Sequence, residues 1–529
     1  MNSAAAEPEL AEPYLLGWLS TVGLDVEYVR AEGNTLYFLD EGREVPVLDY
    51  AGGYGSLIFG HNNPEIVAHA KALLDGGSPV HAQFSRHPYA NQVATALNRI
   101  IHRETGTDEP YSVIFGNSGA EANEAAIKHA ELDRVMRIQQ LGDELAAHVE
   151  QARAAVAEGT ATVSRRALAA AGAETDEEAA GEDPLEALLA GVARHNAERL
   201  ARPPLFLALE GSFHGKLVGS VQLTHNAGYR APFGALAAQA RFVPIGRPEE
   251  LKRIIEEERA ELLDVVVTDG AVEVVPREFP VFCAFLLEPI QGEGGIRVIT
   301  AEFAQAIQQA CVEIDLPILI DEIQSGMGRT GAFLASSLIG LRGDYYTLSK
   351  SLGGGIAKTS VMLVRRARYR KEFELVHSST FAKDHFSCHI ALKVLEMLEA
   401  DDGRAYRVAG ELGEKLTAML EAVRADFPDV VKEIRGKGLM LGLEFHDQSE
   451  AADEGIRETA RAGFLGYAVA GYLLREHRVR TFPTASAVNT LRFEPSTLIS
   501  DAEICQLGSA LRGACSVLRL QDGKRLGGA

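Results

Sequence analysis

The stretch that decides the fold is Leu319-Ile320-Asp321-Glu322-Ile323-Gln324, followed later by Lys350 in Ser349-Lys350-Ser351-Leu352-Gly353-Gly354-Gly355. The first stretch predicts a buried apolar strand that ends in a carboxylate, and the second predicts a lysine above a glycine-rich turn. A buried aspartate and a buried lysine at the ends of neighbouring strands are costly unless they are used. Taken alone, such a pair is more often an ordinary salt bridge, so the other motifs must decide.

Pyridoxal phosphate uses both side chains, because a lysine binds its aldehyde and a carboxylate keeps its ring nitrogen protonated. A place for its phosphate lies at Ser118, Gly119 and Ala120, between a predicted strand and a predicted helix. Backbone N–H groups at a helix N-terminus suit a phosphate, although such a junction alone is usually only a tight turn. This junction carries no GxGxxG motif, and Gly353-Gly354-Gly355 lacks the strand and the acidic residue that a dinucleotide fold would place around it, which disfavours a nicotinamide dehydrogenase.

Nine segments, in the family's order, make the sequence resemble the class III (ω-type) aminotransferases, the ornithine/4-aminobutyrate branch of the fold type I pyridoxal-phosphate enzymes. The segments are Tyr54 to Pro64 (YGSLIFGHNNP), Phe115 to Lys128 (FGNSGAEANEAAIK), Phe213 to Lys216 (FHGK), Glu288 to Gly295 (EPIQGEGG), Asp321 to Phe333 (DEIQSGMGRTGAF), Ser349 to Gly355 (SKSLGGG), Ser379 to Phe381 (STF), Arg435 to Gly442 (RGKGLMLG) and Leu491 to Pro495 (LRFEP). One insertion interrupts them.

The resemblance implies an α/β fold with a mainly parallel central sheet in a large domain and a smaller α+β domain. Continuous apolar runs separated by helical segments agree with a parallel sheet covered on both faces. We expect residues 1–79 to form an N-terminal arm and a small-domain segment, 80–370 the large cofactor-binding domain, and 371–529 the C-terminal small domain.

The insertion covers about residues 131–202 and is rich in Ala, Glu and Arg. Residues 131–157 and 184–201 are predicted to be helices, and the acidic segment 171–183 between them a loop. The second helix has a clear start, with Asp183 as N-cap and Pro184 at the first helical position. Such a helical hairpin either shapes the substrate entrance or decorates the surface, and the sequence leaves both readings open.

The resemblance also implies a set of cofactor-binding residues. Lys350 and Asp321 would be catalytic, Phe213 would stack on the ring, and Ile323 would pack on its other face. Gln324 would reach the ring hydroxyl, and Thr380 would reach the phosphate bound by the other subunit, so we expect a homodimer with shared active sites. The remaining cofactor residues are Ser118, Gly119, Ala120, His214 and Glu288. The continuation after Thr380, Phe381-Ala382-Lys383-Asp384, departs from the family's usual Phe-Gly-Gly-Asn-Pro type.

Four residues are expected to contact the substrate. Glu293 and Arg492 resemble the carboxylate–arginine pair that gates dual specificity, because arginine binds a carboxylate through two hydrogen bonds. When a substrate lacks that carboxylate, Glu293 neutralises the arginine and so avoids an unpaired buried charge. Tyr54 matches a substrate-pocket tyrosine, and Lys216 stands where the ornithine enzyme has a second arginine. Each charge taken alone is more often a surface residue.

Composition excludes several classes of protein. Lys+Arg 52 against Asp+Glu 74 gives a net charge of -22, which disfavours non-specific nucleic-acid binding. No apolar run is long enough to span a membrane, and the first residues lack the pattern of a signal peptide. The five cysteines show no metal-binding or disulfide spacing, so we expect no metal site, buried thiols and a cytoplasmic protein.

The expected activity is amino transfer from an amino acid, with glutamate as the donor, to an aldehyde or ketone without an α-carboxylate. Ile356-Ala357-Lys358 and the insertion differ from the common metabolic members, which favours a secondary-metabolite acceptor. Aminomutases, racemases and decarboxylases of the same fold share every cofactor contact and remain the alternatives. A catalytically silent binding protein on this scaffold is disfavoured by the intact Lys350.

Overall fold

The computed structural model describes residues 13–82, 85–173, 183–236 and 239–527. Residues 1–12 of the expected N-terminal arm and 174–182 of the expected loop therefore lie outside the described residues. Within the described part of the chain, no helix is long and apolar enough to cross a membrane.

A seven-stranded sheet forms the centre of the molecule, and it is mainly parallel as expected. In spatial order its strands are β4 (Tyr111–Gly116), β15 (Ser360–Arg365), β14 (Tyr345–Leu348), β13 (Ile318–Asp321), β10 (Phe282–Leu287), β6 (Leu205–Leu209) and β7 (Gln239–Val243). Only β15 runs antiparallel to its neighbours. Because the remaining strands point the same way, their carboxyl ends share one edge, where ligands of such sheets bind.

Helices cover both faces of this sheet, which explains why its inner strands β13, β10 and β6 are fully buried and almost entirely apolar. Successive residues point to opposite faces, so Leu319 packs with α5 (Gly119–Ala157), whereas Ile318 and Ile320 pack on the other face. The helices of that other face are α3 (Pro64–Asp75), α4 (Tyr89–Thr105), α10 (Pro248–Glu258), α11 (Ala301–Glu313) and the first half of α13 (His385–Asp426).

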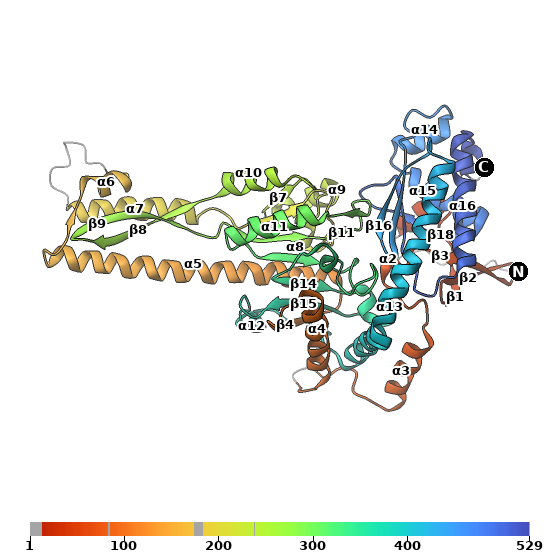
Figure 1. Cartoon of the computed structure of the whole chain (residues 1–529), viewed down its shortest axis with the longest axis horizontal. Helices are drawn as coiled ribbons and strands as arrows, with labels where there is room; N and C mark the ends of the chain where they lie inside the picture. Colours follow the sequence, from red (N-terminus) through yellow and green to blue (C-terminus); the bar gives the residue numbers. More distant parts are fainter. Residues whose placement is uncertain (1–12, 83–84, 174–182, 237–238, 528–529) are drawn as a thin grey trace, which may run out of the picture.

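A smaller α+β region lies beside the edge of the sheet at which the parallel strands end (Figure 1). Its antiparallel sheet contains β16 (Val431–Lys437), β17 (Met440–Phe445), β20 (Thr490–Phe493) and β19 (Phe482–Pro483). Its helices are α14 (Glu454–Arg461), α15 (Leu465–His477), α16 (Asp501–Arg519) and α17 (Gly523–Gly527). The start of α16 is held by a capping box between Ser500 and Glu503.

The N-terminal part of the described chain joins this smaller region. After α1 (Pro13–Thr21), the strands β1 (Tyr28–Glu32), β2 (Thr35–Asp40) and β3 (Arg43–Asp49) form a sheet with β18 (Val479–Arg480). The helix α13 connects the two regions and departs from helical geometry at residues 400–403. Its first half packs into the large core and its second half into the small one. The boundary expected at residues 370/371 stays a prediction.

An arm projects from the large region, as Figure 1 shows at the left of the view. It consists of the outer part of α5, β5 (Thr162–Val163), α6 (Arg165–Ala170), α7 (Pro184–Leu200), β8 (Glu261–Thr268) and β9 (Ala271–Glu278). Asp183 caps α7 as expected, because its side chain accepts a hydrogen bond from the Leu185 N–H at 3.0 Å. The arm differs from the expected helical hairpin, since residues 261–278 add a β-hairpin that pairs with β5.

The arm has a hydrophobic core of its own. Leu188 and Val192 of α7 pack with Val265 and Val272 of the β-hairpin and with Ala152 of α5. Because this cluster is separate from the cores of the large and small regions, the arm is a packed unit of its own and not a loose surface loop.

Candidate active site at the carboxyl ends of the sheet strands

Asp321 is the last residue of β13, and its carboxylate is almost completely buried. Its Oδ2 accepts hydrogen bonds from Asn123 Nδ2 and from His214 Nδ1, each at 2.8 Å. Its Oδ1 accepts from the Ile323 N–H at 3.0 Å. Three donors therefore hold the carboxylate in one orientation and compensate for its burial.

Lys350 follows the neighbouring strand β14 and opens the short helix η3 (Lys350–Gly353) with a φ of +48°. Burial lowers the pKa of the Lys350 amine, whereas the carboxylates of Glu494 and Glu293 raise it. A lowered pKa increases the fraction of neutral amine, which is the form that attacks an aldehyde or takes up a proton.

A cradle for an anion lies where β4 meets α5. Ser118 caps the helix by accepting a hydrogen bond from the Glu121 N–H at 3.3 Å, and Gly119 is the first helical residue. A Cβ at Gly119 would lie 2.8 Å from Cγ2 of Ile323, so only glycine fits there. The Thr380 loop reaches this place through Ser379, whose Oγ accepts a hydrogen bond from Asn117 Nδ2 at 2.7 Å.

Glu288 lies directly after β10, and two backbone donors hold it. The Phe213 N–H donates to Oε2 at 3.0 Å and the Gly292 N–H to Oε1 at 3.1 Å. Burial raises the pKa of Glu288 to about 7, and the nearby Asp321 adds to this rise. Glu288 thus orients the turn at Phe213, and the free-energy cost of burying its charge depends on pH.

The raised pKa of Glu288 leads to a test of stability. Between the ordinary value of 4.5 and about 7, folded protein holds a proton that the unfolded chain has released, so stability falls as pH rises. We expect Glu288→Gln to remove this fall. Urea unfolding of the cofactor-free protein at several pH values from 5 to 8 measures it.

Glu444→Gln is a suitable control for this test, because Glu444 pairs with Lys432 and Arg435 and its pKa is lowered. Its effect on stability should therefore stay constant from pH 5 to 8. A parallel pH dependence in wild type and Glu288→Gln would contradict the assignment.

Arg492 and Glu293 meet in a buried two-pronged ion pair. Nη1 of Arg492 donates to Oε1 of Glu293 at 2.7 Å, and Nη2 donates to Oε2 at 2.6 Å. Although burial alone would raise the pKa of Glu293, the Arg492 charge and the Ala485 N–H lower it. Arg492 Cζ lies 5.0 Å from the centroid of the Tyr54 ring. Three of the four expected substrate residues thus come together.

The fourth, Lys216, lies in a different environment. Its Nζ is exposed and stands 4.4 Å from the centroid of the Tyr229 ring. Tyr229 also makes an edge contact with Phe213, at 6.1 Å between ring centroids. Lys216 therefore lies beside the aromatic pair of Tyr229 and Phe213 and takes no part in the Arg492–Glu293 ion pair.

Several residues of the site were not expected from the sequence. Asn123 connects Asp321 to Thr347, whose hydroxyl donates to Asn123 Oδ1 at 2.8 Å. Tyr229 and Tyr467 lie close enough to Glu293 for its charge to raise their pKa values, in addition to burial. Asn123 could have been found inside the FGNSGAEANEA segment, whereas the tyrosines lie in stretches without a motif.

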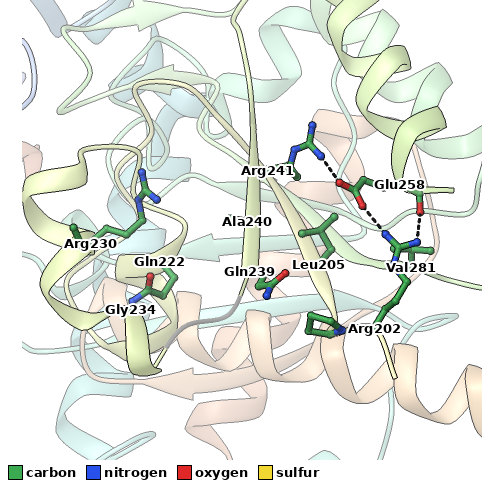
Figure 2. A pocket seen from close by; sticks show the side chains of 12 residues that line it. Arg202, Leu205, Gln222, Arg230, Gly234, Gln239, Ala240, Arg241, Glu258 and Val281 are labelled. Carbon is green, nitrogen blue, oxygen red and sulfur yellow. Dashed lines mark hydrogen bonds and ion pairs between the residues drawn. The ribbon is translucent and has the colours of Figure 1, made fainter. Parts of the chain in front are cut away.

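A conspicuous cavity lies elsewhere, between β6, β7 and the segment before β7 (Figure 2). It has a volume of about 410 Å³ and is lined by Arg202, Arg230, Arg241 and Glu258 among others. Arg202 and Arg241 both pair with Glu258, as the dashed lines in Figure 2 mark. Neither Lys350 nor Asp321 lines this cavity, so it is separate from the candidate active site.

The residues at the sheet edge fit pyridoxal phosphate on several counts. His214 Nε2 is buried and has no hydrogen-bond partner among the described residues, although its Nδ1 is used by Asp321. Gly119 is the first residue of α5, whose N-terminal backbone N–H groups suit a bound phosphate. Asp321 would face the ring nitrogen, and Lys350 supplies an amine of lowered pKa.

Comparison with known proteins agrees with this arrangement. The family model for Aminotransferase class-III matches residues 20–514. Aminotransferase PigE from Serratia sp. is 28% identical over 551 aligned residues, which cover 96% of this chain and 53% of PigE. The chain thus spans about half the length of this curated relative.

Two solved structures illustrate the shared fold. The ornithine aminotransferase from Toxoplasma gondii ME49 has a TM-score of 0.66 at 19% identity, covering 97% of each chain. The amine transaminase from an uncultivated Pseudomonas species, in its PLP-bound form, has a TM-score of 0.66 at 20% identity, covering 97% of this chain and 98% of that one. Together with the sheet-edge site, the match over nearly the whole chain shows that this protein belongs to the class-III aminotransferases, which depend on pyridoxal 5'-phosphate.

Proposed function

We propose that this aminotransferase moves an amino group from glutamate to an aldehyde or ketone that carries no α-carboxylate. The observation that supports this most strongly is the buried, two-pronged pair of Arg492 and Glu293 near Lys350. Arg492 would bind the donor's carboxylate, and Glu293 would release it on donor binding and pair with it again when the uncharged acceptor is present.

The roles of the remaining residues follow from their positions. When bound, pyridoxal phosphate withdraws electrons from the substrate carbon that carries the amino group. Asp321 would hold the positive charge on the ring nitrogen. Lys350 Nζ would take the proton from the substrate carbon that carries the amino group and would deliver it to the cofactor carbon that receives this group. Phe213 would orient the ring, since Glu288 fixes its backbone.

Aromatic side chains around the ion pair suggest an acceptor with an apolar portion. Tyr54 stacks on Phe482 at 5.9 Å between centroids, and Tyr467 makes an edge contact with Trp18 at 4.9 Å. Such a wall favours an apolar or aromatic carbonyl compound over a second charged amino acid. A specialised acceptor of this kind agrees with the secondary-metabolite role expected from the sequence.

We also propose a homodimer in which Thr380 contacts the cofactor phosphate of the partner subunit. The support is the resemblance of Ser379-Thr380-Phe381 to the family segment whose threonine reaches the phosphate bound by the other subunit. Native mass spectrometry tests the assembly. Mixing Lys350→Ala with Thr380→Ala subunits tests whether the active site is shared, because only a shared site restores activity in the mixed dimer.

The cytoplasmic location expected from the sequence stays a prediction.

The experiment that tests the function is an acceptor panel with glutamate as the donor. Formation of free 2-oxoglutarate together with an aminated acceptor, both detected by mass spectrometry, supports amino transfer. Conversion of the amino acid without 2-oxoglutarate would instead indicate an aminomutase, a racemase or a decarboxylase.

Variants of the ion pair should separate the two half-reactions. Arg492→Ala is expected to slow the reaction with glutamate far more than the reaction with a simple amine, because charge-assisted pairs contribute about 1.5–3 kcal/mol. Glu293→Ala should impair the simple amine instead, since it leaves Arg492 buried and unpaired. Single-turnover absorbance changes for each donor measure both rates. Equal losses of rate for both donors in Arg492→Ala would show that Arg492 does not bind the donor's carboxylate, and Lys216 would become the favoured carboxylate site.

A further inference from the structure

Glu494 is a completely buried carboxylate whose role neither the motifs nor the gate explains. It follows β20 directly, and its backbone N–H donates to the Tyr50 carbonyl at 2.7 Å. Its Oε1 accepts a hydrogen bond from Gln324 Nε2 at 2.8 Å. Its Oε2 is buried and has no hydrogen-bond partner within the described part of the chain. A carboxylate oxygen in that state is costly, so a use for it is expected.

Neighbouring backbone packs tightly around this carboxylate and around Gln324. A Cβ at Gly55 would lie 3.0 Å from Glu494 Oε1, and a Cβ at Gly292 would lie 2.1 Å from Gln324 Oε1. The carboxamide of Gln324 is thus confined, with its nitrogen turned toward Glu494. Because an amide nitrogen carries two hydrogens, one N–H remains for a second acceptor.

Two cations lie near enough to Glu494 to feel its charge, the fully buried Arg329 and the partly buried Lys350. Arg329 is fully buried and donates to the backbone carbonyls of Gly55, Leu439 and Pro495. Burial lowers the pKa of Arg329 to about 10, and Glu494 opposes this change. The turn of Lys350 reaches the same place, because Ser351 Oγ donates to the Gly55 carbonyl at 2.8 Å. Although burial lowers the pKa of Lys350, Glu494 is foremost among the carboxylates that raise it, ahead of Glu293 and Asp321.

We propose that Glu494 is a positioning residue of the active site with two tasks. It holds the Gln324 carboxamide so that an N–H faces the cofactor ring oxygen, and its free Oε2 receives the Lys350 ammonium while that lysine is not bonded to the cofactor. The assignment rests on the aminotransferase site itself and not on the identity of donor or acceptor. It requires no group that the chain and its cofactor do not supply.

If Glu494 served only as the counter-charge of Arg329, removing its charge would not change the titration midpoint of Lys350. Glu494→Gln removes the charge but keeps an oxygen that can accept from Gln324. In the cofactor-free protein, the neutral fraction of Lys350 can be measured by competitive acetylation with acetic anhydride across pH, read by peptide mass spectrometry. We expect Glu494→Gln to lower the titration midpoint of Lys350 by about one pH unit, which corresponds to about 1.4 kcal/mol.

Glu322→Gln is the matched control. Glu322 is equally buried and adjoins Asp321, but its carboxylate is held by Ser325 at 2.6 Å and by the Ser336 N–H at 2.7 Å. We expect this variant to leave the Lys350 midpoint unchanged. Circular dichroism and thermal unfolding establish that each variant is folded before its midpoint is compared.

The first task has its own readout in the cofactor-loaded protein. Glu494→Leu removes the acceptor for Gln324, so it should shift the visible absorbance band in the same direction as Gln324→Leu. The two shifts should not add in the double variant, whereas Glu494→Gln should retain most of the wild-type band position. An unchanged Lys350 midpoint in folded Glu494→Gln, or additive band shifts in the double variant, would overturn the proposal and leave Glu494 as the counter-charge of Arg329.

Discussion

Replacing Lys350 by alanine is expected to abolish amino transfer while the protein still folds and retains part of its affinity for pyridoxal phosphate. The reason is that the proposed phosphate cradle at Gly119 and the proposed ring contacts of Phe213 and Asp321 belong to other segments of the chain than the Lys350 amine. The covalent bond to the lysine and the proton transfer at Nζ would both be lost. Absorbance spectra, cofactor binding by equilibrium dialysis and steady-state rates measure these effects separately.

Lys358→Ala is the matched control for this substitution, because Lys358 is an exposed lysine just after the same glycine-rich turn. It should leave the turnover number near the wild-type value. Added small amines should restore a fraction of the activity of Lys350→Ala. Appreciable turnover of Lys350→Ala without any added amine would refute the catalytic assignment.

Asp321→Asn should have the second largest effect, a fall in the proton-transfer rate by orders of magnitude. The substitution preserves the size of the side chain but removes the negative charge that keeps the ring nitrogen protonated. It also places an amide N–H among the donors Asn123, His214 and the Ile323 N–H, where only an acceptor fits. Single-turnover kinetics with a deuterated donor isolates the proton-transfer step from binding.

The matched control for Asp321 lies at the opposite edge of the same sheet. Asp344 precedes β14, and its Oδ2 accepts a hydrogen bond at 2.9 Å from the N–H of Ile318, the first residue of β13, whereas Asp321 is the last. Asp344→Asn should lower thermal stability with little change in rate. A loss of less than tenfold in Asp321→Asn, about 1.4 kcal/mol of barrier, would show that Asp321 does not have this role.

Much of the large region could be predicted from local patterns. The apolar runs at 111–115, 205–209, 284–287, 318–320 and 361–364 correspond to strands of the central sheet, because a strand buried on both faces is apolar at every position. The direction of β15 could not be predicted in this way. An antiparallel strand inside a covered sheet has the same composition as its parallel neighbours.

In the arm, local sequence patterns predict the start of a helix but not the pairing of distant strands. Asp183 and Pro184 carry a capping signal that lies within the helix itself, so the start of α7 could be predicted. The pairing of β5 with β9 could not, since these strands lie about a hundred residues apart and β5 contains only Thr162 and Val163.

By itself, the sequence determined the family and its cofactor, because this cofactor requires particular side chains directly after particular strands. Asp321 and Lys350 meet that requirement through the lengths of β13 and β14 and the turns that follow them. Only the tertiary structure decided what surrounds them. Gln324 and Glu494 are 170 residues apart in the chain, and they meet because the small region packs against the sheet edge. Burial of this kind depends on the whole fold, whereas strand and turn propensities depend on near neighbours in the chain.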